Sequence, residues 1–211
     1  MDNLLSYLYY TPVASVIFVI TIGLSLYVFS NEHYFGKLML HPYGIKRDRT
    51  KLYTIITSGL IHKDGMHLLF NMFTFYYFGF ALESMFVQFS GPIGHFLFAG
   101  FYILTLILSD VPTLVRHKDN PGYYSLGASG AICAVLFSFI LFQPKQMLGL
   151  FMIIPIPAYL FGFLFLGYCI WAAKQSRDSI NHDAHLFGAL AGLVLTLLLY
   201  PWSFSHFLSQ F

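Results

Sequence analysis

Residues 125–143 have the sequence SLGASGAICAVLFSFILFQ, an uncharged and mostly apolar run. A helix that crosses the hydrocarbon core of a bilayer needs roughly 20 such residues, so the run predicts a transmembrane helix. Ser129 lies near the start of this run, between Gly127 and Gly130, and His185 lies at the start of a later apolar run. Ionisable groups are costly inside a membrane, so these two polar residues at similar depth indicate a functional site.

The composition of the chain points to a membrane protein. Of its 211 residues, 57% are hydrophobic and only 9% are charged, whereas a soluble domain carries about 25% charged residues. The formal net charge of +2 argues against a nucleic-acid partner. Cys133 and Cys169 both lie in apolar stretches, where thiols usually pack as small hydrophobic groups, so a disulfide is disfavoured. We therefore expect an integral membrane protein surrounded by lipid.

Apolar runs recur along the chain and predict an all-α membrane protein: a six-transmembrane-helix bundle in one polytopic domain over residues 1–211. The predicted spans are 12–30, 66–88, 92–109, 125–143, 147–172 and 184–201. Proline and glycine mark their ends, and Pro112 is expected to follow the end of the third span. The fifth span carries Pro155 and Pro157, so its helix is expected to bend or to start late.

The connection from about 31 to 65 is much longer than the others and mixes basic residues with Leu, Met, Tyr and Ile. Two interpretations remain open: a partly membrane-embedded segment with its apolar side down, or a solvated basic loop. The first run, Val13 to Phe29, is expected to be a membrane anchor, because no basic residue precedes it and no small-residue cleavage site follows. Every Lys and Arg except Lys145 falls on one side of the predicted membrane, which the positive-inside rule would make cytoplasmic.

Ser129 is the candidate nucleophile. A serine in a transmembrane helix usually bonds back to a carbonyl one turn earlier, so the residue alone is a weak signal. The flanking Gly127 and Gly130 remove side-chain bulk, so that a substrate backbone could approach the hydroxyl closely. The position near a helix N-terminus leaves backbone N–H groups without partners, and these could donate to an oxyanion.

His185 is the candidate base. It follows Asn181-His182-Asp183-Ala184, and Ala184, Gly188 and Gly192 recur every four residues behind it. Such a stripe of small residues lets membrane helices pack backbone to backbone. If the stripe meets Gly127 and Gly130 on the fourth span, His185 lies near Ser129, because both helices begin on the same side. A histidine that serves only in packing is the alternative, and Asp183 is expected to be interfacial.

His67 and Asn71 form the third element. Their i, i+4 spacing stacks them on one face of the second span, and both can donate to a developing negative oxygen. The second span starts on the same side as the fourth and sixth, so four polar residues are expected to converge. A zinc site is the rival interpretation, disfavoured because there is no HExxH pair and no cysteine at ligand spacing. Its candidate ligands are His62, His67, His182 and His185.

Together, Gly127-Ala128-Ser129-Gly130, Ala184-His185 with Gly188 and Gly192, and His67 with Asn71 resemble the motifs of the rhomboid intramembrane serine proteases. The similarity extends over a core of about residues 53–200. The resemblance implies Ser129 as nucleophile, His185 as base, and His67 and Asn71 with the Ser129 amide as oxyanion donors. It also implies a structural role for Glu83, and a membrane orientation opposite to the one that the charges favour.

One departure from the family concerns the base. The aromatic residue that the family often carries four positions after the nucleophile, where it packs on the base, is Cys133 here. We therefore expect His185 to be held less firmly or by another ring.

The sequence thus leads to one preferred function and two alternatives. The preferred function is a serine endopeptidase that cleaves peptide bonds in or next to transmembrane segments of membrane proteins through an acyl-enzyme. No metal or organic cofactor is required, and the expected location is the bacterial plasma (inner) membrane. The alternatives are an inactive rhomboid-like protein that binds transmembrane helices, and a small transporter that uses histidines as a proton relay. The absence of internal repeats argues against the transporter.

Overall fold

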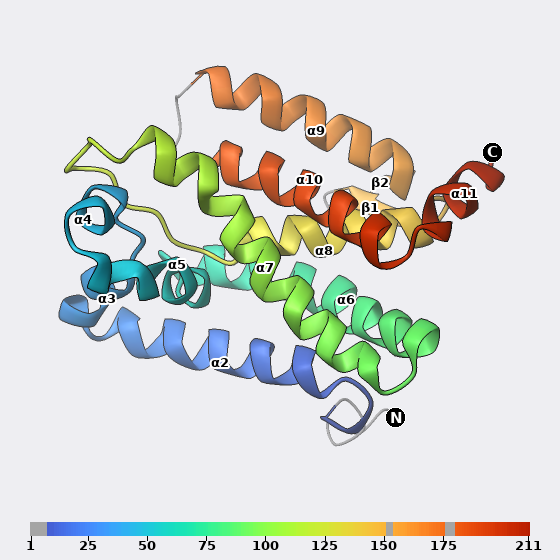
Figure 1. The fold of residues 1–211 in the computed structure, drawn as a ribbon, viewed down its shortest axis with the longest axis horizontal. Coiled ribbons are helices and arrows are strands. Elements are labelled where there is room, and N and C mark those ends of the chain that lie inside the picture. Colours follow the sequence, from blue (N-terminus) through green and yellow to red (C-terminus); the bar gives the residue numbers. More distant parts are fainter. Residues whose placement is uncertain (1–7, 151–153, 176–179) are drawn as a thin grey trace.

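The computed structural model describes residues 8–150, 154–175 and 180–211, and these residues are mostly helical (Figure 1). The long helices are α2 (Pro12–Phe29), α6 (Gly65–Ser90), α7 (Ile93–Arg116), α8 (Ser129–Phe142), α9 (Ala158–Gln175) and α10 (His182–Leu199). Between α2 and α6 lie α3 (Glu32–Leu38), α4 (Pro42–Arg47), η1 (Arg49–Tyr53), α5 (Thr54–Thr57) and η2 (Ser58–Leu60). The strands β1 (Met147–Leu150) and β2 (Ile154–Pro157) precede α9, and α11 (Trp202–Ser209) follows α10.

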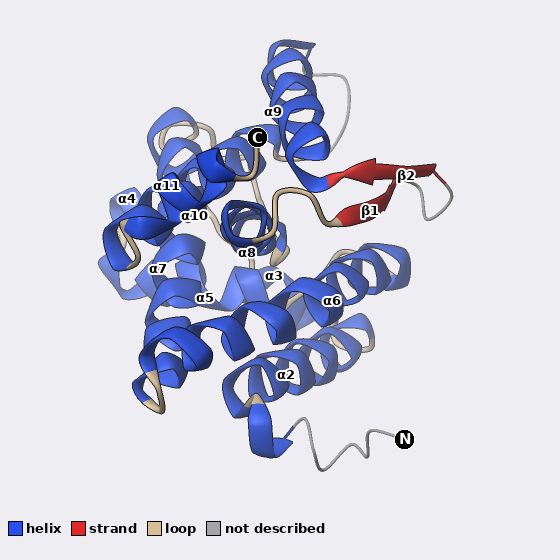
Figure 2. Cartoon of the chain, turned by 90° about the vertical axis from the view of Figure 1, so that its right-hand side faces the viewer, coloured by secondary structure: helices blue, strands red, loops and turns tan. Residues whose placement is uncertain are grey.

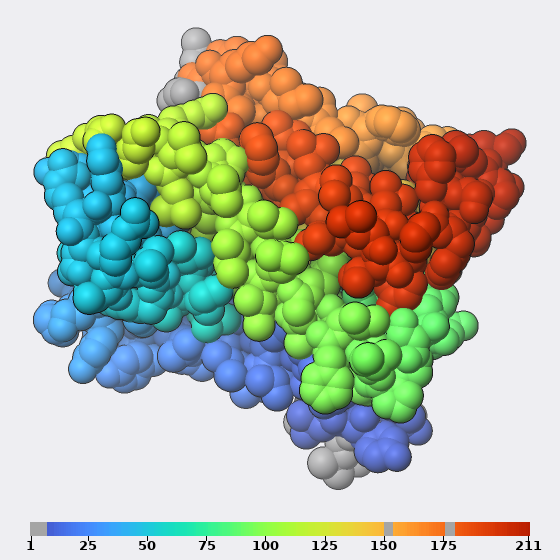
Figure 3. Space-filling model, in the orientation of Figure 1, coloured from blue at the N-terminus to red at the C-terminus, as the bar shows by residue number. Residues whose placement is uncertain are grey.

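Helix α8 forms the centre of the bundle. Every residue of α8 after Ser129 is buried, and Figure 2 shows the helix nearly end-on with α6, α7, α9 and α10 around it. Helices α2 and α9 lie at opposite edges of the molecule in both views. In Figure 3, α7 crosses one face diagonally, between the 31–60 segment and α10. The uncharged character of 125–143 is therefore explained by burial inside protein.

The outer surface has the apolar character of a membrane protein. Helices α2, α7 and α10 are long and apolar enough to cross a bilayer, while α8 is apolar but shorter. Large apolar side chains point outward, such as Phe96 at 78%, Leu198 at 71% and Phe163 at 67% exposure. An apolar surface of this kind on helices long enough to span a bilayer is typical of a protein surrounded by lipid. The all-α membrane class is thus confirmed.

The third and fifth predicted spans have different boundaries in the structure. The third was expected to end at 109, yet α7 continues through Pro112 to Arg116, because neighbouring helices can compensate the backbone hydrogen bond that a proline removes. The fifth was expected to cover 147–172, but residues 147–150 and 154–157 form the antiparallel strands β1 and β2, in which Met147 pairs with Pro157. Proline disfavours the helix interior, so α9 starts at Ala158, and the expected late start is confirmed.

The fourth predicted span also begins later than expected. Residues 125–127 are not helical. Ser125 forms an isolated antiparallel β-bridge with Leu40, and Gly127 has a φ of 119°. That φ value lies outside the helical region. Helix α8 therefore starts only at Ser129.

The long 31–65 segment folds against one end of the bundle. Leu40, Ile45 and Ile61 are buried, and the backbones of Leu40 and Ser125 exchange two hydrogen bonds of 2.9 and 3.0 Å. Lys46 pairs with Asp119 at 2.6 Å, which ties α4 to the loop after α7. Leu40, Ile45 and Ile61 therefore pack on protein rather than in a solvated loop, while Tyr34, Leu52 and Tyr53 of the same segment are exposed.

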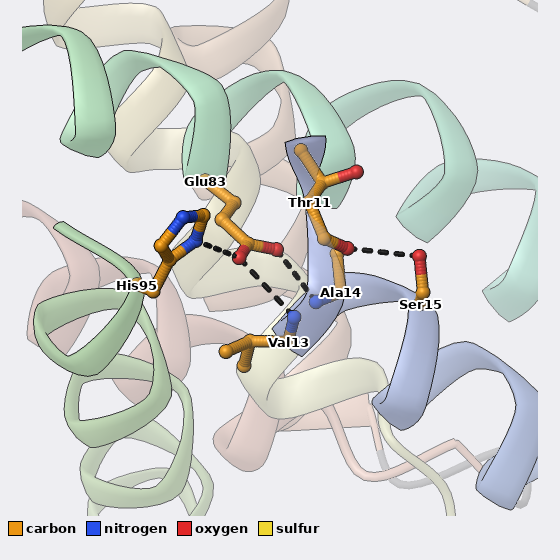
Figure 4. A network of polar contacts seen from close by, with 6 residues as sticks. All are labelled: Thr11, Val13, Ala14, Ser15, Glu83 and His95. Carbon is orange, nitrogen blue, oxygen red and sulfur yellow. Dashed lines mark hydrogen bonds and ion pairs between the residues drawn. The ribbon is translucent and has the colours of Figure 1, made fainter. Parts of the chain in front are cut away.

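Glu83 on α6 holds the start of α2 (Figure 4). Its fully buried carboxylate accepts hydrogen bonds from the backbone N–H groups of Val13 at 3.2 Å and Ala14 at 2.6 Å. The ring nitrogen Nδ1 of His95 on α7 lies 2.6 Å from the same carboxylate. A negative charge at a helix N-terminus is stabilising, so this one residue joins three helices.

His62, at the end of the 31–65 segment, predicts a stability that depends on pH. The ring is fully buried and its Nδ1 lies 3.0 Å from the Ser25 hydroxyl. Burial, and then the nearby charge of His67, lower its pKa from 6.5 to about 3. Because the folded state holds this ring neutral while the unfolded chain protonates it below pH 6.5, its contribution is present above that pH and is lost on acidification. Lowering the pH from 7 to 5 is expected to cost about 2 kcal/mol.

Thermal unfolding in detergent at the two pH values measures this effect. We expect His62→Asn to flatten the pH dependence, while His33→Asn, at an exposed histidine, keeps it. An unchanged slope in His62→Asn would contradict the assignment.

Candidate active site

The segment before α8 positions Ser129 at the first turn of the helix. The φ of 119° at Gly127 lies in the region that favours glycine. A Cβ atom at this position would also meet the His67 ring, at 2.7 Å from Cε1. Glycine is therefore required at 127 for its conformation and for the close approach of α6. The backbone turns here so that the Ser129 hydroxyl faces a cavity rather than the core.

Small residues bring α10 directly onto α8. A Cβ atom added at Gly188 would collide with the Gly130 carbonyl, and one at Gly192 would collide with the Ala134 carbonyl. Deeper in the pair, the Thr196 hydroxyl donates to the Ser138 hydroxyl at 2.6 Å. The stripe of small residues is thus the surface at which the two backbones meet.

Ser129 and His185 come together at the start of this helix pair. The Ser129 Oγ atom lies 2.7 Å from Nε2 of His185, which is within hydrogen-bonding distance. The ring of Phe165, from α9, stacks near His185 with centroids 6.3 Å apart and an angle of 29°. An aromatic ring from another helix therefore packs beside His185, although the sequence carries Cys133 where the family often has an aromatic residue.

Asn181 and Asp183 anchor the start of α10. The Asn181 side-chain oxygen accepts from Ala184 N–H at 3.1 Å, which caps the helix. Its Nδ2 donates to the hydroxyls of Thr113 at 2.8 Å and Ser125 at 3.3 Å. Asp183 forms an ion pair with Arg116 at the end of α7. The start of α10 is thus tied to α7 and to the loop before α8, which orients His185 toward Ser129.

A cavity of about 650 Å³ contains the Ser129–His185 pair, and His67 and Asn71 also line it. Asn71 Nδ2 donates to the His67 carbonyl at 2.9 Å, and His67 Nδ1 lies 3.4 Å from the Lys63 N–H. Side chains from α6, α7, α8 and α10 share the cavity. The four site residues predicted from the sequence therefore lie around one space.

Asp110 is a cavity residue that the sequence analysis missed. Only 8% of it is exposed, and it lines the cavity beside Ser109. The prediction that the third span ends at 109 assigned Asp110 to a loop. With α7 extended to Arg116, Asp110 becomes a carboxyl group inside a membrane helix, and such a group is the signal that would have identified it.

The four histidines of the rival zinc interpretation separate into two pairs. His62 lies against His67, with ring centroids 4.9 Å apart, and His182 lies against His185 at 6.0 Å. Among the described residues, the group suited to a metal ion is Cys169 with His182 and His185, whose ligand atoms all lie within 4.8 Å of one another.

The fold and the cavity define a class: a helical membrane protein that holds a serine hydroxyl against a histidine inside a polar cavity. The Rhomboid domain model matches residues 49–202, and the chain belongs to the rhomboid family. Members of this family are generally intramembrane serine proteases.

The relatives of this chain among known proteins include two plant proteins and one bacterial protein. The chain is 29% identical over 178 residues to "RHOMBOID-like protein 12, mitochondrial" of Arabidopsis thaliana, covering 79% of this chain and 52% of that protein. It is 27% identical over 199 residues to "Rhomboid-like protein 11, chloroplastic" of the same plant, covering 87% and 65%. It is 30% identical over 149 residues to "Putative rhomboid protease YdcA" of Bacillus subtilis (strain 168), covering 68% and 65%.

The chain therefore spans between about half and two thirds of the length of these relatives. Two of them are named for the mitochondrion and the chloroplast. The family and the apolar helices make the chain an integral membrane protein, but they do not support the bacterial inner membrane that was expected.

Proposed function

We propose that this protein is an intramembrane serine endopeptidase that hydrolyses peptide bonds in or next to transmembrane segments of other membrane proteins. The observation that carries the proposal is the 2.7 Å contact between Ser129 Oγ and His185 Nε2 within the cavity. Acyl transfer requires a nucleophile, a base in contact with it and donors for the oxyanion. A protein that only binds helices needs none of these groups.

In the proposed reaction, His185 Nε2 takes the proton of the Ser129 hydroxyl as the oxygen attacks the scissile carbonyl. The tetrahedral intermediate collapses to an acyl-enzyme, and His185 gives the proton to the leaving amine. Water then attacks the ester with His185 again as base, which releases the second product and restores the serine. Phe165 and Asn181 would orient the base. Phe165 packs beside the His185 ring, and Asn181 caps the helix α10 that carries His185.

The oxyanion would receive hydrogen bonds from His67, Asn71 and the backbone N–H of Ser129. Support comes from the position of Ser129 in the first turn of α8, where N–H groups have no intrahelical acceptor. His67 and Asn71 line the same cavity. Loss of one such donor costs about 3 kcal/mol, or 10²–10³-fold in rate, in other serine proteases. Gly127 and Gly130 would leave room for the substrate backbone.

We further propose that α2, α6, α7, α8, α9 and α10 are six membrane spans of a single polytopic domain, with the 31–65 segment partly embedded at one surface. Helix α8 is short for a span because it begins at Ser129 inside the molecule, and the cavity above it would give water access to the hydroxyl. A substrate with a transmembrane segment is supported by the position of Ser129, which lies inside the protein at the start of the apolar helix α8.

The test is incubation of purified protein in detergent with a reporter that carries one transmembrane segment. We expect the wild type to release a discrete fragment, while Ser129→Ala releases none and Ser205→Ala, which alters an exposed serine, behaves as wild type. Cleavage by Ser129→Ala at the wild-type rate would refute the assignment.

Asn181 provides a separate prediction about the orientation of the base. Asn181→Ala removes the cap of α10 and both hydrogen bonds to hydroxyls, so we expect a stability loss of about 1 kcal/mol from the cap and a fall in kcat with little change in KM. The control Asn181→Asp keeps the capping oxygen and should retain the stability. An unchanged kcat in Asn181→Ala would show that the cap does not position His185.

A further inference from the structure

A cysteine and two histidines meet behind the Ser129–His185 pair. Cys169 on α9 is fully buried and His182 on α10 is 5% exposed, while His185 is half-buried. One ligand atom from each of the three lies within 4.8 Å of the other two. His182 and His185 share a helix face because they are three residues apart, and α9 supplies the sulfur opposite them. The grouping is absent from the sequence pattern, since Cys169 is far from both histidines in the chain.

This set of donors fits zinc. Zn²⁺ binds thiolate sulfur at about 2.3 Å and imidazole nitrogen at about 2.0–2.1 Å in a tetrahedron, so the three ligand atoms would stand roughly 3.3–3.6 Å apart. The ligand atoms lie within 4.8 Å of one another, so a shift of about 1 Å in the side chains would bring them to that separation. Thiolate and imidazole are both zinc ligands, and a site with three protein ligands leaves the fourth position open to water or a further ligand. Hard cations such as Mg²⁺ and Ca²⁺ prefer oxygen ligands and do not fit.

We propose that Cys169, His182 and His185 form a zinc site, and that zinc bound there switches off the Ser129–His185 pair. The inhibitory part rests on the proposed protease function. Binding of the ion releases the thiol proton of Cys169 to solvent, and both histidines coordinate as neutral rings.

The reason for inhibition is that His185 belongs to both groups. If zinc binds Nε2, it occupies the lone pair that would accept the proton of Ser129. If zinc binds Nδ1, the one proton of the neutral ring stays on Nε2, so Nε2 donates to Ser129 Oγ and cannot accept from it. Either coordination leaves the serine without a base. The zinc ion therefore has a regulatory role, and the reaction itself proceeds without it.

Metal binding is measured first, without reference to activity. We expect the purified, reduced protein in detergent to bind one Zn²⁺, and to bind Co²⁺ with the thiolate charge-transfer and visible bands of a tetrahedral sulfur site. These bands should be lost in Cys169→Ala and in His182→Ala. They should persist in Cys133→Ala, which alters the other buried cysteine. Thermal unfolding shows whether each variant is folded, and a folded Cys169→Ala that keeps the bands would overturn the site.

Cleavage of the reporter is measured second. Equimolar Zn²⁺ should slow the metal-free wild type at least tenfold, and EDTA should restore it. Because loss even of outer-shell partners weakens metal sites by about 10–100-fold, Cys169→Ala should need at least ~100-fold more Zn²⁺ for the same inhibition. Equal sensitivity of Cys169→Ala and wild type would overturn the switch.

A failure of the proposed protease function gives a different result from a failure of the zinc site. If the metal-free wild type shows the cobalt bands but never cleaves the reporter, the zinc site stands, and the protease assignment falls together with the switch.

Discussion

His185→Ala is expected to slow cleavage of a transmembrane reporter by on the order of 10⁴-fold or more, as loss of the base does in other serine proteases. The Ser129 hydroxyl is a weak nucleophile unless a base takes its proton during attack. His185 Nε2 lies 2.7 Å from this oxygen, and the remaining cavity residues offer donors to the oxyanion. The loss should fall on kcat, because His185 acts on the transition state rather than on substrate binding. Reporter cleavage over a range of substrate concentrations measures both constants.

The matched control is His33→Ala, at an exposed histidine of α3, and it should leave both constants unchanged. A rate for His185→Ala within tenfold of the wild type would exclude the Ser–His mechanism. Zinc must be chelated in every sample, because His185 is also a ligand of the proposed zinc site.

Glu83→Ala is expected to destabilise the fold more than any surface substitution. The side chain is fully buried and accepts from two backbone N–H groups of α2 and from His95. Its removal leaves the start of α2 without a cap and the His95 ring without its carboxylate. Hydrogen bonds to charged groups and broken buried pairs predict a loss of about 3–5 kcal/mol. For a chain of this size that loss corresponds to a fall in Tm of roughly 10 °C in detergent.

Two variants sharpen this prediction. Glu83→Gln keeps one acceptor oxygen without the charge and should recover part of the stability. Glu32→Ala removes an exposed glutamate of α3 and should change Tm little. A Tm for Glu83→Ala equal to that of Glu32→Ala would mean that the carboxylate does not hold α2 in place.

Hydrophobicity predicted the positions of the helices whose apolar runs contain no internal proline. The predicted spans 12–30 and 184–201 correspond to α2 (Pro12–Phe29) and α10 (His182–Leu199). Local signals failed where tertiary contacts override them. Pro112 does not end α7, because packing against neighbouring helices compensates it. The apolar run from 147 contains the strands β1 and β2, because short apolar stretches fit a strand or a helix equally well.

The candidate site also contains residues that the sequence could predict and residues that only the fold reveals. Ser129, His185, His67 and Asn71 carry functional groups in recognisable patterns, so the sequence could name them. Phe165, Asn181, Asp110 and Cys169 matter through the partners that the fold brings to them. No spacing in the chain relates Phe165 or Cys169 to His185, because they lie on a different helix.

The most direct measurement of the central claim is covalent labelling of purified, metal-free protein with a serine-directed phosphonate, followed by mass spectrometry of its peptides. The phosphonate reacts only with a serine whose proton a neighbouring base removes. We predict that Ser129 alone is modified, and that the modification disappears in His185→Ala while it persists in His33→Ala. Modification of a different serine, or undiminished labelling of Ser129 in His185→Ala, would contradict the Ser129–His185 mechanism.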